Sequence, residues 1–144
     1  MIGNFLSRLF AQDAAPLEDA DERLAIAVLM VRLACSDEDY AEEERIEIDA
    51  VLARRYDLSA AEVATLRHEA EEVEAEAQDT VKFTRAIKDK IAIEDRIAVM
   101  RDFWHIALAD GTRDAHENAQ MRLMTGLLGL TDQESARARQ MAEQ

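Results

Sequence analysis

One helical unit occurs twice in this chain, and the repetition restricts the fold more than any other feature. The later copy, 106–134, reads IALADGTRDAHENAQMRLMTGLLGLTDQE, which indicates a helix end, an acidic turn, a second helix, a glycine stop and the start of a third helix. A weaker copy occupies 33–62, and aligning Asp37 with Asp110 also aligns the glutamate seven residues further on. Because one unit cannot cover its own apolar face, the repetition predicts that two such units pack together.

The composition and the periodicity of the apolar residues predict an all-α fold. Only four glycines and one proline interrupt 144 residues, and no stretch alternates apolar and polar residues as a strand would. We therefore expect a single-domain bundle of about seven helices, built from two pseudo-symmetric repeats. The expected segments are an N-terminal arm and linker at 1–21, and a helical domain at 22–144 with repeats at about 22–79 and 80–144. The expected helices are 22–35, 41–56, one after Ser59, a short one after Thr80, 94–109, 115–128 and one after Thr131.

Three local patterns fix parts of this arrangement. The segment LAIAVLMVRLAC within 22–35 is apolar almost all round, which is typical of a helix buried on most sides. Ser59 with Glu62, and Thr131 with a glutamate three residues later, form capping boxes that begin helices. Gly129 is placed to end the preceding helix in a left-handed conformation.

The N-terminal residues 2–10 place five apolar side chains on one helical face. Two interpretations remain open, an arm docked on the bundle or an anchor for a partner or a membrane surface. Membrane contact through 2–10 is the weaker one, because Arg8 is the only basic residue there. There is no convincing signal peptide, the longest apolar run is too short to span a bilayer, and the single cysteine, Cys35, excludes an internal disulfide. We therefore expect a cytoplasmic protein.

The formal net charge of −14 bears on the class of partner. It opposes a phosphate backbone, so it excludes nucleic acid as the main partner. It suits cations or a basic protein surface instead. The helix after Ser59 adds a run of glutamates on one side, which is most simply a solvated face.

The acidic turns hold more carboxylates than helix capping explains. Asp37 and Asp110 follow helix C-termini, where the helix dipole disfavours negative charge by roughly 0.3–1 kcal/mol. Oxygen-only ligands suit calcium, magnesium or manganese, whereas zinc is the weaker candidate because it would need His105 or His116. An EF-hand loop is excluded, since its required glycine would fall on Glu42. The candidate metal ligands are Asp37, Asp39, Glu44, Asp110, Asp114 and Glu117.

The chain resembles the TerB family, the tellurite-resistance protein B group and its relatives. The resemblance rests on ALADG at 107–111, Asp114, Glu117 and LLGLTDQE at 127–134, with a weaker copy at 34–62. It implies an all-helical fold of two related halves, acidic positions suspected of binding metal, and a link to tellurite and stress resistance. It supplies no reaction. The first copy departs from the pattern, with Ala41 where the second copy has Asp114.

Two functions therefore remain open. The first is a non-enzymatic TerB-like stress protein whose acidic turns bind a divalent cation. The alternative is a metal-free interaction module that meets a basic protein partner, or another copy of itself, through its acidic surface and apolar arm. A hydrolytic metal enzyme is less well supported, because the sequence contains neither a Glu-x-x-His pair nor a glycine-rich phosphate loop.

Overall fold

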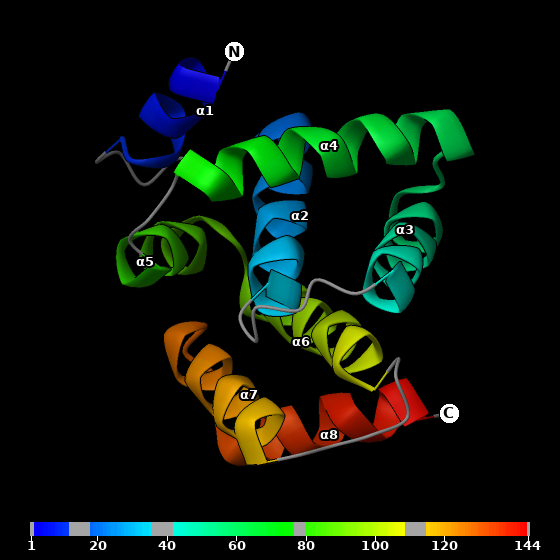
Figure 1. Ribbon diagram of the computed structural model, residues 1–144. Helices are drawn as coiled ribbons and strands as arrows, with labels where there is room; N and C mark the ends of the chain where they lie inside the picture. Colours follow the sequence, from blue (N-terminus) through cyan, green and yellow to red (C-terminus); the bar gives the residue numbers. More distant parts are fainter. Residues whose placement is uncertain (1, 12–17, 36–41, 77–79, 109–114, 144) are drawn as a thin grey trace.

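Eight α-helices and no strands make up the computed structural model where it describes the chain, at residues 2–11, 18–35, 42–76, 80–108 and 115–143. This confirms the all-α prediction. The arm forms a helix of its own, and seven further helices follow (Figure 1). The helices are α1 (Ile2–Leu9), α2 (Asp19–Cys35), α3 (Glu42–Tyr56), α4 (Ala60–Glu76), α5 (Thr80–Lys90), α6 (Ile93–Ala107), α7 (Ala115–Leu127) and α8 (Asp132–Glu143).

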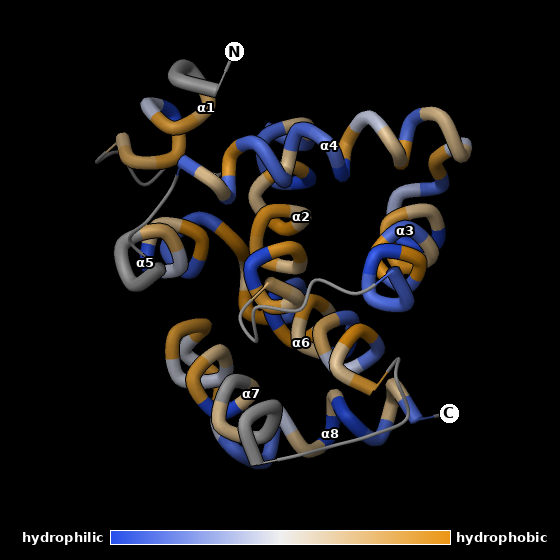
Figure 2. The backbone as a smooth tube through the Cα atoms, viewed as in Figure 1, coloured by the Kyte–Doolittle hydropathy of each residue, from blue (hydrophilic) through white to orange (hydrophobic). Residues whose placement is uncertain are grey.

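Helix α2 lies at the centre of the bundle. Every residue from Ala25 to Val31 is buried, so the helix has no exposed side over two turns. Helix α4 crosses it, and α3 and α6 also pack against it (Figures 1 and 2). The apolar run in the sequence thus predicted the central helix correctly. No helix within the described residues is both long and apolar enough to cross a membrane.

The packing of the helices follows the sequence repeat. In the first copy α2 packs most extensively on α4, and in the second copy α6 packs most extensively on α8. The middle helix of each copy, α3 or α7, contacts both of its neighbours. The halves are joined where α2 and α3 contact α6. This pattern agrees with two related halves around a shared core.

Both capping boxes form as the sequence predicts. The Ser59 backbone N–H donates to Glu62 Oε1 over 2.9 Å, and the Glu62 N–H donates to the Ser59 hydroxyl over 3.2 Å. Thr131 and Glu134 exchange the same two bonds, at 2.8 and 3.1 Å. These bonds satisfy backbone donors that the first turn of a helix leaves open, so α4 and α8 begin where the motif places them.

Two further helix boundaries can be compared with the prediction, the end of α7 and the start of α2. Gly129 has φ +71° and follows the end of α7, as predicted. The positive φ favours glycine, whereas the nearest atom to a Cβ here would be Lys88 Cε at 2.8 Å, near the end of a flexible side chain that can move aside. Helix α2 begins at Asp19, three residues before the expected start. The expected linker therefore ends earlier, because Asp19 and Asp21 favour the positive N-terminal end of a helix dipole.

Helix α1 is docked on the bundle. Phe5 and Leu9 are 2% and 0% exposed, and the Phe10 ring meets the Phe83 ring of α5 edge-on at 6.4 Å. The apolar face of the arm is therefore used inside the protein, as the docked interpretation expects.

Candidate functional site

The structure describes one of the six candidate metal ligands in full. Glu44 lies in the first turn of α3 and is half-buried. Glu117 lies in α7, but its side chain is outside what the structure describes, as are the four aspartates Asp37, Asp39, Asp110 and Asp114. Among the side chains that are described, no three His, Cys, Asp or Glu residues come close enough together to hold a metal ion. Metal binding by these six residues therefore stays a prediction.

Several carboxylates raise the pKa of the cysteine at which the first acidic turn begins. Cys35 is the last residue of α2, and burial raises the pKa of its thiol to about 11, with further contributions from Glu74, Glu71 and Glu44. Arg45 partly opposes this effect. Negative charge from α3 and α4 thus acts on the thiol at the end of α2. The raised pKa keeps the Cys35 thiol protonated at neutral pH, so the thiol is a poor nucleophile.

A groove of about 990 Å³ lies between α1, α2 and α4. Its apolar floor includes the large side chains of Phe5, Leu24, Leu58, Leu66 and Val73. Along its α4 side runs a row of exposed glutamates at spacings of seven, three and four residues, which places them on one face of the helix. These glutamates are Glu62, Glu69, Glu72 and Glu76. We call this feature the acidic groove.

The walls of the acidic groove are held by local polar contacts. The Arg8 guanidinium on α1 binds both carboxylate oxygens of Asp21 on α2, with Nη2 donating to Oδ1 over 2.9 Å. Hydrogen bonding to Ser59, first through its backbone N–H, lowers the pKa of Glu62. The arm is therefore pinned to α2 at one wall, and the first glutamate of the row stays ionised at neutral pH.

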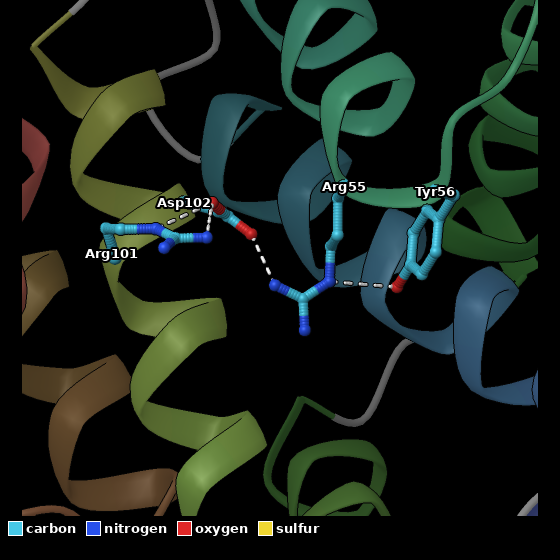
Figure 3. Close-up of polar contacts among 4 residues, drawn as sticks. All are labelled: Arg55, Tyr56, Arg101 and Asp102. Carbon is cyan, nitrogen blue, oxygen red and sulfur yellow. Dashed lines mark hydrogen bonds and ion pairs between the residues drawn. The ribbon is translucent and has the colours of Figure 1, made fainter.

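A second polar site joins the two halves (Figure 3). Asp102 of α6 has a side chain only 4% exposed, and it accepts a hydrogen bond from Arg55 Nη1 of α3 at 2.6 Å. Arg101 contacts the same carboxylate with Nε at 3.3 Å and Nη2 at 3.2 Å. Arg55 Nε also donates to the Tyr56 hydroxyl over 3.2 Å. One buried carboxylate thus serves two guanidinium groups from different halves of the chain.

The sequence analysis missed this site, although a signal for it was present. The sequence analysis gave Asp102 no role. Asp102 lies three residues after Val99 and four before Ile106, and both of these side chains are buried. A carboxylate on that face of an amphipathic helix must be buried, and a buried carboxylate requires a cationic partner.

Among the described carboxyl groups, Glu22 on α2 is the one whose surroundings disfavour the ionised form. Burial raises its pKa, Asp95 of α6 and Asp19 raise it further, and Arg55 lowers it in part. A carboxyl whose pKa is higher in the folded chain than in the unfolded chain favours folding when protonated. Its contribution is complete below the unfolded pKa of about 4.3 and is lost as the pH rises through the folded pKa.

We therefore expect Glu22→Gln to stabilise the protein at pH 7 by a few tenths of a kcal/mol, since solvent screens a partly exposed group. The gain should vanish near pH 4. Thermal unfolding from pH 4 to pH 8 measures it. Glu69→Gln, at an exposed position of α4, is the control for the general relief of negative charge. Equal stabilisation by both variants at every pH would contradict the expectation.

Comparison with known proteins places the chain in a family. No curated protein matches it, and no solved structure does. The family model described as Tellurite resistance protein TerB matches residues 23–140, which include α3, α4 and both copies of the repeat. This match confirms the resemblance carried by the second acidic turn and the capping box, and the chain belongs to the TerB family.

Proposed function

We propose that this chain is a non-enzymatic binding protein of the tellurite and stress response, and that its acidic groove accepts a basic amphipathic helix from a partner protein. The observation that carries the proposal is the pairing, in one groove, of an apolar floor with a row of exposed glutamates on one edge. A helix laid in such a groove would place apolar residues on the floor and basic residues against the row.

The charges of the groove favour a basic occupant. Five carboxylates line it, but only two arginines do. Arg8 is already paired with Asp21, and the Arg23 guanidinium lies over the Tyr56 ring at 4.9 Å. The remaining glutamates of α4 therefore dominate the local potential, and the net charge of −14 would speed the approach of a basic segment.

The dimensions of the groove suit a helix of several turns. Helix α4 has 17 residues and is therefore ~25 Å long. The glutamate row extends from its first turn to its last residue, Glu76. A partner helix of about 14 residues could meet the whole row with basic residues repeated every three or four positions.

A synthetic 14-residue helix with leucines on one face and lysines on the other is a direct probe. We expect it to bind in a saturable manner, and Glu69→Lys combined with Glu76→Lys to weaken the binding about tenfold or more. Fluorescence anisotropy at about 0.1 M salt measures the affinity, and circular dichroism checks the fold.

The matched control is Asp89→Lys combined with Glu143→Lys, which changes the net charge equally at exposed positions outside the groove. A Leu66→Ser variant tests the apolar floor without changing the charge. If the control pair weakens binding as much as the groove pair, and Leu66→Ser has no effect, attraction to net charge alone explains the binding and the groove proposal fails.

A second candidate function is binding of a divalent cation at the acidic turns. The observation that favours it is that the charges of Glu74, Glu71 and Glu44 all raise the pKa of Cys35 at the end of α2, where the first turn begins. Additional carboxylates in such a field would repel one another unless a cation intervened. Calcium, magnesium and manganese fit oxygen ligands best, and zinc is the weaker candidate.

Titration calorimetry with the four ions tests this second candidate. We expect saturable heat for at least one ion, and stabilisation against thermal unfolding that approaches ~2.7 kcal/mol at one hundred times the dissociation constant. Asp110→Asn combined with Asp114→Asn should abolish binding at the second turn, whereas Asp89→Asn should not. No heat and no thermal shift with any ion would remove the cation proposal. The peptide assay, repeated with a chelator, reports on the groove separately.

A further inference from the structure

Helices α3, α6 and α8 enclose a second, smaller cleft of about 470 Å³, separate from the acidic groove. Three arginines and one histidine line it, together with the carboxylate of Asp102 and the apolar side chains of Val51 and Met141. The four are Arg54 and Arg55 from α3, and Arg101 and His105 from α6. The cleft is therefore cationic on a chain whose net charge is −14.

The arginines of the cleft are more numerous than its carboxylates. Asp102 is shared between Arg55 and Arg101, so it compensates one guanidinium charge and not two. Within the described residues, Arg54 takes part in no ion pair. The lining thus keeps a positive charge that the known contacts of the fold do not balance.

The contacts with Asp102 also hold the donors in place. Arg55 binds Asp102 through Nη1 and Tyr56 through Nε, and Figure 3 shows its other terminal nitrogen directed away from both partners. Arg101 uses Nε and Nη2, which leaves its second terminal nitrogen outside the pair with Asp102. Because their orientation is already fixed, these donors would lose little entropy on meeting an anion.

We propose that this cleft binds a small oxyanion of the phosphate class, held by Arg54, Arg55 and Arg101. Guanidinium groups match the oxygens of a phosphate in pairs, and the cleft lies within the usual size range of small-ligand sites. The general negative field of the protein opposes such a ligand at long range. At physiological ionic strength, however, it is screened beyond about 8 Å, so the nearby arginines dominate.

Titration of inorganic phosphate into the full chain at constant ionic strength tests the proposal. We expect saturable shifts of the Arg55 and Arg101 Nε–H signals in NMR spectra, and about tenfold weaker binding for Arg54→Gln. Arg137→Gln, at an exposed position of α8 outside the cleft, removes the same charge and should leave the affinity unchanged. Arg54 is exposed, so its replacement should not disturb the fold.

A second titration with glycerol phosphate distinguishes free phosphate from a phosphate monoester as the natural ligand. Tighter binding of the monoester would indicate that the apolar walls take part, and tighter binding of inorganic phosphate would indicate the ion itself. Both results support an oxyanion site. The proposal is overturned if neither ligand gives a saturable shift, or if Arg137→Gln weakens binding as much as Arg54→Gln does.

Discussion

Leu29→Ala is expected to lower the free energy of unfolding by about 3–5 kcal/mol, the largest effect of any change considered for this protein. Leu29 is 0% exposed, and it lies in the part of α2 that is buried on every side. Removing three carbon atoms there loses their transfer free energy and leaves a cavity that neighbouring helices can fill only partly. Urea denaturation followed by circular dichroism measures the loss.

Two controls separate this cavity effect from a general effect of substitution. Ile46→Ala on α3 removes an aliphatic side chain that is 60% exposed, and it should change stability by no more than about 0.5 kcal/mol. Leu29→Met keeps the volume and should cost less than about 1.5 kcal/mol. If Leu29→Ala and Ile46→Ala had equal effects, α2 could not be the central helix.

The central position of α2 could be predicted from the sequence because it depends on one local property. A helix with apolar residues on all sides has no face to offer to water, whatever its neighbours are. The capping boxes at Ser59 and Thr131 and the glycine stop at Gly129 are local in the same sense, since each joins residues a few positions apart. Helix boundaries were predicted to within a few residues for this reason.

Contacts between distant segments could not be predicted in the same way. The Arg8–Asp21 pair, which fixes the arm against α2, joins residues 13 positions apart across the expected linker. The pattern of 2–10 showed an apolar face but not what would cover it. The acidic groove depends on that docking, because α1 supplies one of its walls. The glutamate row alone indicated only a solvated helix face.

The candidate metal site also combines local features, which the sequence predicts, with long-range features, which it does not. The chemistry of its six residues could be inferred from their type and their repetition in the two turns. Their arrangement in space depends on how the two turns are placed, and only Glu44 lies with its side chain in the described part of the chain. Glu71 and Glu74, whose charges act on Cys35 together with that of Glu44, come from α4, nearly thirty residues later, so no spacing within the turn could have indicated them.

The second large effect is expected at the contact between the halves, where Asp102→Ala should lower the free energy of unfolding by about 2–3 kcal/mol. The change leaves Arg55, whose side chain is 13% exposed, without the carboxylate that balances it. Breaking a buried pair in this way costs about 3–5 kcal/mol in general. The lower figure applies here because Arg55 lines the cleft, from which water can solvate it in part.

Urea denaturation of three further variants shows whether Asp102→Ala loses stability because the charge of Arg55 is left without a partner. Arg101→Ala removes the more exposed partner of Asp102, at 35%, and should cost less than about 1 kcal/mol. Replacing both partners, Arg55→Met with Asp102→Leu, should recover most of the stability that Asp102→Ala loses, because no charge is left without a partner. If the double variant is instead no more stable than Asp102→Ala, with Arg55→Met alone nearly neutral, Asp102 must act through packing within α6. The halves would then be joined by apolar contacts alone, and the guanidinium groups of the cleft would lack the fixed orientation that anion binding requires.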